Sequence, residues 1–297
     1  MKKVLITGVS VIDFIFQIDA IPNNFEKYRA NNASISGGGV AANAAVAIAK
    51  LNGKPSLVSR IGKDEIGLMI KNGLIKENVN LDNLIIFDGH KSSFSSVYIN
   101  KNGDRQVMNY RDHTLPVDAS MIANIKEHDA YLVDSRWKEG ALQTLKLAKK
   151  NCAPGIVDAE ETVTQEIIKE ASHIAFSMNG LKVFTKIQNK FEALKSIKNI
   201  SSAWVCVTDG ENGVYYLKDN KLENIPAKKI TVKDTLGAGD VWHGAFALSL
   251  AEGNDEVNAI KFANSAATLK CKFFGGRDGF PNRQQVDQFL MEYKSCN

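Results

Sequence analysis

The stretch Asp234-Thr-Leu-Gly-Ala-Gly-Asp-Val-Trp-His-Gly244 places two acids around two glycines, directly ahead of an apolar run with helical character. Gly237 and Gly239 let the backbone turn tightly and approach a ligand closely. A helix that begins at Ala238 has free N–H groups in its first turn, and such groups stabilise the charge of a phosphate. The stretch therefore predicts a glycine-rich turn into a helix that carries an anion site.

Short apolar runs alternate with longer segments of helical period along the rest of the chain. The strand-like runs include VLITGV, LVSRIG, AYLVD, GIVDAE, HIAFS and AWVCVTDG, and helix-like runs such as VAANAAVAIAKL and ALQTLKLAKK lie between them. Because these strands are apolar on both faces, they predict an α/β fold with a mainly parallel sheet covered by helices on each side. We expect the N-terminal stretch MKKVLITGVSVIDFIF to form the first strand, with Asp13 at its end.

Two segments depart from this alternation. Residues 92–99 and 105–110 are strand-like and flank Asn102-Gly103, a dipeptide that favours a hairpin. Residues 14–36 are too irregular for a helix and too long for an ordinary loop. Together they predict a small β lid, inserted as about residues 14–36 and 92–112, over the sheet edge where open α/β folds bind ligands. We expect one domain that spans residues 1–297, with a further hairpin at 213–226.

Composition excludes several classes of partner. The chain has 297 residues, 44% of them hydrophobic, and a formal net charge of +4 without a basic block of the kind that grips nucleic acid. No apolar run is long enough to span a membrane. The four cysteines, Cys152, Cys206, Cys271 and Cys296, are too widely spaced to indicate a zinc site or a disulfide framework. We expect a cytoplasmic protein that acts on small molecules and binds neither nucleic acid nor membrane.

The acids of the opening stretch each have two interpretations. Asp240 lies in the first helical turn, where it either stabilises the helix dipole or acts as a general base beside the anion site. Asp234 is either a turn residue or an acid that associates with a cation. His243 follows Asp240 by three residues, and we expect it to be packed rather than catalytic.

A second unusual stretch is Ser36-Gly-Gly-Gly-Val-Ala-Ala-Asn43. Its three glycines remove side chains where a strand meets a helix, and Asn43 offers both donors and acceptors from the first turns of that helix. This arrangement suits a polyhydroxyl ligand, although close packing of helix against sheet explains the glycines equally well. Asp13 adds a carboxylate at the same sheet edge, where it either accepts from a ligand or caps a turn.

Taken together, these segments resemble the ribokinase-like family of carbohydrate kinases, also called the phosphofructokinase-B type. The matching pieces are GVSVIDFIF, SGGGVAANAAVAIAKLNGKPSLVSRIGKDEIG, VTDGENGVYY and DTLGAGDVWHGAFALSLAEG, which together cover nearly the whole chain. The resemblance implies a three-layer α/β/α fold with a β lid, and transfer of the γ-phosphate of ATP, accompanied by Mg²⁺, to a sugar hydroxyl.

The resemblance also implies roles for individual residues. Asp240 would be the catalytic base, with an anion hole at Gly237, Ala238 and Gly239. The sugar would be bound by Asp13, Gly37, Gly38, Asn43 and Asp240, and the nucleotide by Thr208, Gly210, Gly237, Gly239, Asn264 and Gly276. Asp234 lies where related enzymes hold K⁺. Many members carry Asn-x-x-Glu to organise Mg²⁺, but the matching stretch here is Ser177-Met-Asn-Gly180, so the magnesium ligands stay unassigned.

Within this family the chain is most similar to ketose kinases, in particular sulfofructose kinases, through EKYRANN, VMNYRDHTLP, VDSRWKEGA, IAFSMNGL and FANSAATLKCKFFGGRDGFP. Lys27, Asn109 and Arg136 match the positions at which those enzymes hold a sulfonate, and such side chains suit a tetrahedral anion. We expect phosphorylation of a primary hydroxyl, at C1, of 6-deoxy-6-sulfofructose or a similar anionic hexulose. Ketohexokinase also carries DTLGAGD, so a fructokinase or a ribokinase-type kinase of a neutral sugar is the alternative.

Two further classes of protein share single features with this sequence. A sugar- or nucleotide-binding regulator without activity would explain the altered Asn-x-x-Glu region, but the intact Asp240 favours an enzyme. A dinucleotide-dependent oxidoreductase would need G-x-G-x-x-G after the first strand, and GVSVID stands there instead. We also expect a homodimer that forms through the β lid.

Overall fold

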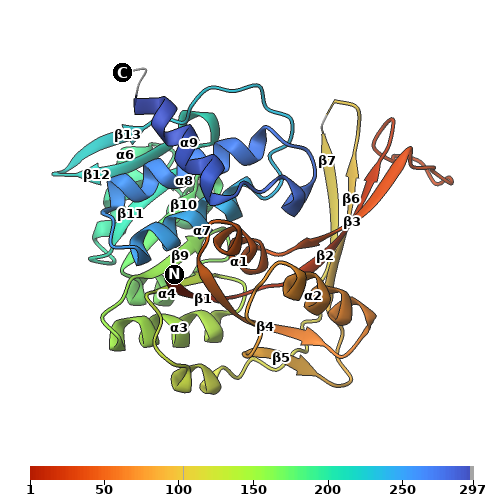
Figure 1. Cartoon of the computed structure of the whole chain (residues 1–297), viewed down its shortest axis with the longest axis horizontal. Coiled ribbons are helices and arrows are strands. Elements are labelled where there is room, and N and C mark those ends of the chain that lie inside the picture. The colour runs from red at the N-terminus through yellow and green to blue at the C-terminus, as the bar shows by residue number, and fades with distance from the viewer. Residues whose placement is uncertain (103, 295–297) are drawn as a thin grey trace.

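The computed structural model of the chain describes residues 1–102 and 104–294 and is built around one large twisted sheet (Figure 1). In spatial order its strands are β13 (Lys221–Ile225), β12 (Val214–Lys218), β11 (Trp204–Thr208), β10 (His173–Ser177), β9 (Gly155–Ala159), β8 (Ala130–Asp134), β1 (Lys3–Thr7), β4 (Lys54–Gly62) and β5 (Leu84–Phe87). Neighbours from β11 to β5 run parallel, and β12 pairs antiparallel with both β11 and β13. The predicted α/β fold and the hairpin at 213–226 are confirmed.

Helices cover both faces of this sheet. One face carries α1 (Val40–Lys50), α2 (Glu65–Lys76), α7 (Ala238–Ala251), α8 (Glu256–Cys271) and α9 (Arg283–Lys294), and the other carries α3 (Lys138–Lys150), α4 (Gln165–Glu170), α5 (Met178–Thr185) and α6 (Lys190–Lys198). In β1, Val4 and Ile6 pack on the first side while Leu5 packs on the second, as alternating side chains of a strand must. Burial on both faces explains why the strands are apolar throughout, and it confirms the expected three-layer arrangement.

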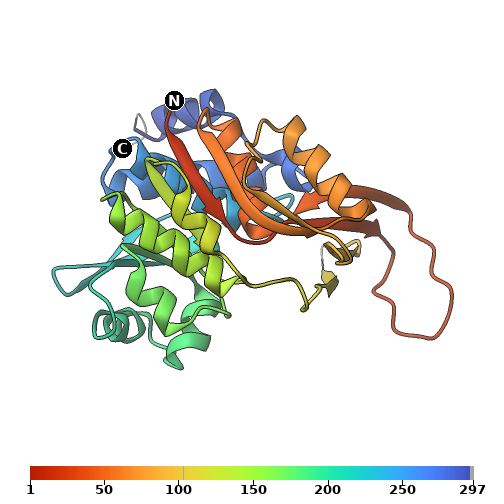
Figure 2. The same cartoon turned by 90° about the horizontal axis from the view of Figure 1, so that it is seen from below.

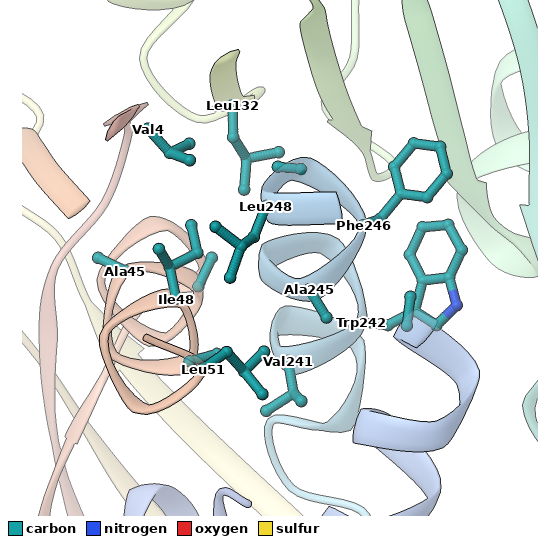
Figure 3. Close-up of a cluster of buried hydrophobic side chains, with 14 of the residues drawn as sticks. Val4, Ala45, Ile48, Leu51, Leu132, Val241, Trp242, Ala245, Phe246 and Leu248 are labelled. Carbon is teal, nitrogen blue, oxygen red and sulfur yellow. The ribbon is translucent and has the colours of Figure 1, made fainter. Parts of the chain in front are cut away.

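Helices α1 and α7 pack closely at the centre of the first face (Figure 3). Figure 3 shows Ile48 of α1 and Leu248 of α7 directed towards each other in the space between the two helices. Close approach depends on small residues, because a Cβ added to Gly244 would lie 2.7 Å from the Ala44 carbonyl oxygen. The alanine-rich sequence of α1 therefore lets the two helices that carry Asn43 and Asp240 meet.

The predicted lid is a second, smaller sheet with the order β3 (Asn32–Gly38), β2 (Val11–Gln17), β6 (Ser93–Ile99) and β7 (Arg105–Tyr110). It stands beside the main body, and the loop between β2 and β3 extends furthest from it (Figures 1 and 2). The sheet is mixed, since β2 pairs parallel with β6. The expected turn at Asn102-Gly103 includes Gly103, which lies outside the described residues.

The prediction of one N-terminal strand was wrong. The chain forms β1 in the main sheet and, after a break at Gly8, continues as β2 of the lid. Gly8 allows this break because its missing side chain makes room for Asp134, whose Oδ2 would lie 2.1 Å from an added Cβ. Asp13 therefore lies within a lid strand rather than at the end of the first strand.

None of the helices within residues 1–102 and 104–294 is both long and apolar enough to cross a membrane. Cys152, Cys206 and Cys271 are free thiols, and the fourth cysteine, Cys296, lies outside the described residues.

Candidate active site

The glycine-rich turn ends at the N-terminus of α7, as predicted. Gly237 caps the helix with a left-handed backbone (φ 78°), a conformation that glycine adopts without strain. A Cβ added to Gly239 would meet nothing within 4 Å, so the space above this residue is open to a ligand. The Ala238 N–H already donates to the Thr235 carbonyl at 3.1 Å, which argues against its expected place in the anion hole. The first-turn N–H groups of Gly239 and Asp240 have no acceptor one turn earlier within the helix.

Asp240 projects from this first turn and is partly buried. Burial raises the pKa of its carboxyl group to about 6, although a hydrogen bond from Asn43 opposes the shift. The Asn43 Nδ2 atom donates to Asp240 Oδ2 at 2.7 Å. A carboxylate with such a pKa can accept a proton near neutral pH, whereas an ordinary aspartate is too weak a base.

A buried arginine fixes the orientation of Asn43. Arg277 Nε donates to Asn43 Oδ1 at 2.8 Å, and its terminal nitrogen donates to the Gly38 carbonyl at 3.0 Å. Because guanidinium has only donors, the amide oxygen must face Arg277 and the amide nitrogen must face Asp240. A Cβ at Gly37 would lie 2.0 Å from Arg277, so this glycine makes room for the guanidinium. Arg277 was not among the predicted site residues.

Asp13 lies beside this group on lid strand β2. A Cβ added to Gly38 would lie 2.1 Å from Asp13 Oδ2, so any side chain at this position would clash with the carboxylate. Burial raises the pKa of Asp13, while a hydrogen bond from Ser95 and the charge of Arg277 lower it. Ser95 in turn accepts from Asn109 Nδ2 at 3.0 Å. The structure thus joins the predicted residues Asp13, Gly38 and Asn109 along the lid.

Further carboxylates lie at the end of β9, with Asp158 in the strand and Glu160 directly after it. Asp158 is 3% exposed, and its Oδ2 lies 3.1 Å from His243 Nδ1, while burial raises the pKa of Asp158 and lowers that of His243. The histidine is packed, as expected. Glu160 accepts from the Ser177 hydroxyl at 3.0 Å, and its charge contributes to the raised pKa of Asp240. Glu160 therefore brings an acid close to the site, beside the stretch that lacks Asn-x-x-Glu.

The residues expected around the nucleotide differ in whether they are free to contact a ligand. Gly210 has positive φ and open space around it, and Thr208 is partly exposed at the end of β11. Asn264 is 8% exposed, accepts from Trp242 Nε1 at 2.8 Å and donates to the Ile225 carbonyl at 3.1 Å. Both ends of this amide are engaged within the protein, which argues for a positioning role.

Gly276, another residue expected at the nucleotide, packs against Ser36 of lid strand β3. A Cβ added to Gly276 would be 2.7 Å from the Ser36 hydroxyl. Gly276 directly precedes Arg277, so it helps to seat the guanidinium under β3.

Asp234 already has a cation beside it. Lys270, which is fully buried, places its ammonium 2.8 Å from Asp234 Oδ2 and 3.1 Å from the Asp234 carbonyl oxygen. The N–H groups of Leu236 and Gly275 also donate to the carboxylate. A buried carboxylate with these partners is neutralised by the chain itself.

Arg136 lines a cavity of about 350 Å³ at the ends of β1, β4 and β8, together with Arg60 and Arg111. Lys27 and Asn109 are not among the described residues that line it. Lys27 lies exposed in the loop between β2 and β3, so the structure does not bring the three predicted anion-binding residues together within one chain.

Comparison with known proteins identifies the class of molecule. The ribokinase of Bacillus subtilis (strain 168) is 28% identical over 297 residues, with 98% of this chain and 100% of the relative covered. The fructokinase of Vibrio alginolyticus is 25% identical over 320 residues, covering 98% and 99%. The structure of Arabidopsis thaliana ribokinase complexed with ribose and ATP has the same fold, with a TM-score of 0.87 at 22% identity over 97% and 98% of the two chains.

The fold and lid are those of the ribokinase-like proteins. A family model described as pfkB family carbohydrate kinase matches residues 1–283. The chain therefore belongs to the pfkB family of carbohydrate kinases, and the resemblance seen in its motifs is confirmed.

Proposed function

We propose that this sugar kinase transfers the γ-phosphate of ATP to a primary sugar hydroxyl, with Asp240 as the general base. The observation that carries the proposal is the Asp240 carboxylate, with a pKa near 6, in the first turn of α7 and oriented by Asn43 and Arg277. ATP is supported by the family and by the Arabidopsis ribokinase complex.

The reaction follows from this geometry. The sugar hydroxyl gives its proton to Asp240 as its oxygen attacks the γ-phosphorus, and the bond from phosphorus to the β–γ bridging oxygen breaks to release ADP. The Gly239 and Asp240 N–H groups stabilise the charge on the transferring phosphoryl group. Asp13 accepts hydrogen bonds from other sugar hydroxyls, beside Gly37 and Gly38.

The residues present fit Mg²⁺ bound chiefly by the phosphates of ATP. Within residues 1–102 and 104–294 there is no group of three or more His, Cys, Asp or Glu side chains that would hold a metal alone. Glu160, whose charge reaches Asp240, is the acid that we propose to bind the ion through water. When bound, Mg²⁺ would neutralise phosphate charge. We propose no K⁺ requirement, because Lys270 already neutralises Asp234.

The substrate that we favour is a ketose phosphorylated at C1 and carrying an anion at C6, such as 6-deoxy-6-sulfofructose. The cationic cavity at Arg136 supports an anionic sugar. A neutral sugar is the second candidate, because the relatives of this chain include a ribokinase and a fructokinase.

ADP release in the presence of ribose, fructose, fructose 6-phosphate or 6-deoxy-6-sulfofructose tests both proposals. We expect the highest kcat/KM with an anionic hexulose. Replacement of Asp240 by Asn should lower kcat by on the order of 10² to 10⁴, because the base is lost while the anion site is kept. Near-normal turnover by D240N would remove Asp240 as the base, and no ADP with any sugar would favour a regulator.

A further inference from the structure

The cavity beside Arg136 is lined by two further arginines that have not yet been given a role in binding the sugar. Its wall combines residues that follow β1, β7 and β8 with Arg60 of β4, and three guanidinium groups, those of Arg60, Arg111 and Arg136, contribute to it. A volume of about 350 Å³ is ample for a sulfonate or phosphate group with its linking carbon. The three arginines differ in the hydrogen bonds that their guanidinium groups make within the protein.

Arg60 is engaged by the protein. Its terminal nitrogen donates to the carbonyl oxygens of Leu115 and Pro116, at 3.3 and 2.8 Å, and its guanidinium lies over the Trp137 ring at 4.4 Å. These contacts make Arg60 part of the cavity wall.

Arg111 is different, because its Nε atom is buried and has no hydrogen-bond partner among the described residues. A donor shielded from water and left unpaired is rare in folded proteins, and it indicates a missing acceptor. Arg111 and Arg136 line the same cavity, and burial and the charge of Arg136 lower the pKa of Arg111, while the charge of Asp134 opposes this shift. An anion between them would relieve this repulsion.

The carboxylates near the cavity do not supply that acceptor. Asp134, which is 3% exposed, accepts from the backbone N–H groups of Val9 and Arg136 at 2.7 and 2.9 Å. Asp112 accepts from the Lys91 N–H and from Thr114. Glu139, which also lines the cavity, interacts with Arg60, because its charge raises the pKa of that guanidinium group.

The cavity adjoins the place where the sugar would lie. Val9 lines it, and the Val9 carbonyl accepts from the Ala42 N–H, next to Asn43, at 3.4 Å. The positive charge of Arg136 also lowers the pKa of Asp240. A hexulose with its C1 hydroxyl at Asp240 would therefore direct its far end towards Arg111 and Arg136.

We propose that Arg111 acts with Arg136 to bind a tetrahedral anion, a sulfonate or phosphate, at the far end of the sugar, and that Arg111 is a specificity-determining residue. The proposal rests on the proposed function, because it assumes that the sugar binds at Asp240. Two converging guanidinium groups can hold several oxygens of one anion at once, which a neutral hydroxymethyl group cannot match.

The test compares Arg111→Met, which keeps the length of the side chain without its charge, with Arg111→Lys and with Lys146→Met. Lys146 is exposed on α3 and does not line the cavity, so its variant controls for net charge. We expect R111M to lower kcat/KM for fructose 6-phosphate or 6-deoxy-6-sulfofructose by about 10- to 100-fold, the loss expected for one charge-assisted hydrogen bond. Its kcat/KM for fructose should change less than about twofold, R111K should recover only part of the loss, and K146M should match the wild type. Whichever of the two anionic sugars has the higher kcat/KM shows whether the cavity prefers a phosphate or a sulfonate.

Equal losses for anionic and neutral sugars in R111M, or no loss for either, would overturn the assignment of Arg111. If the wild type phosphorylates no sugar, the proposed function fails separately, and anion binding still tests the cavity. In that case inorganic phosphate or methanesulfonate should raise the wild-type melting temperature above that in chloride of equal ionic strength, and R111M should lose this rise. A rise retained by R111M would refute the proposal.

Discussion

At the scale of single residues, the site depends on neighbours that change the chemistry of ordinary side chains. Asp240 is suited to the role of base that we propose because burial raises its pKa to about 6, and Asn43 limits that rise through the 2.7 Å hydrogen bond. Arg277 acts one step further away by fixing the amide of Asn43. Hydrogen bonds thus connect the three residues in a relay from the buried guanidinium of Arg277, through Asn43, to the carboxylate proposed as the base.

The relay predicts how activity depends on pH. Because the base must be ionised, kcat/KM should rise with pH through about 6 and be about tenfold below its plateau at pH 5. Asn43→Ala removes a hydrogen bond to the ionised carboxylate, so the acidic limb should move to higher pH. The exposed Asn80→Ala is the control and should leave the limb in place. An unchanged limb in N43A would show that Asn43 does not tune Asp240.

Lys270 predicts independence from K⁺. Its buried ammonium contacts both the carboxylate and the carbonyl oxygen of Asp234, the atoms that a monovalent cation would otherwise bind. Sugar-dependent ADP release should therefore be equal in potassium, sodium and tetramethylammonium chloride. Lys270→Met should lower the free energy of unfolding by about 3–5 kcal/mol, since it leaves a largely buried carboxylate without its cation. A wild-type rate that falls when K⁺ is withdrawn would contradict this interpretation.

At the scale of elements, the contact between α1 and α7 positions Asp240, the proposed base, beside Asn43. Gly244 touches the backbone of α1 at Ala44, so a side chain there must push the helices apart. Gly244→Ala should lower the free energy of unfolding by about 1–3 kcal/mol despite the better helix propensity of alanine, measured by chemical denaturation. Gly73→Ala in α2 has open space and should instead stabilise by about 0.5–1 kcal/mol. If Gly244→Ala also stabilised the protein, the contact between α1 and α7 would have room for a side chain, contrary to this prediction.

Local sequence patterns predicted most of these elements, because the period of apolar residues and the turn signals are local properties. They did not predict the division at Gly8, where the room for Asp134 depends on a residue 126 positions away. The short edge strand β5 and the parallel pairing of β2 with β6 were also missed. Motifs led to Asp240, Asn43 and Asp13. Arg277, Arg111, Glu160 and Lys270 were not predicted, since their roles follow from contacts between distant segments.

At the scale of the whole molecule, the lid leaves apolar side chains uncovered in one chain. Ile35 on edge strand β3 is 58% exposed, and Val107 and Met108 on edge strand β7 are 57% and 71% exposed. Apolar edge strands favour pairing with another chain. The homodimer expected through the lid therefore stays a prediction that this surface supports.

Light scattering after gel filtration tests that prediction. The wild type should have twice the chain mass of 32.6 kDa. The double change Ile35→Lys and Val107→Lys should give monomers, because charge at both edges opposes association, whereas Val183→Lys on α5 should not. A monomeric wild type at micromolar concentration would refute the dimer.

The link between Asn43 and Arg277 also bears on how the protein is made. The two partners are 234 positions apart, and Arg277 lies beyond α8, near the end of the described chain. During synthesis, the lid strands and α1 leave the ribosome long before the guanidinium that organises them exists. The nascent chain is thus expected to consume no ATP until the segment that carries Arg277 has been synthesised and has docked under the lid.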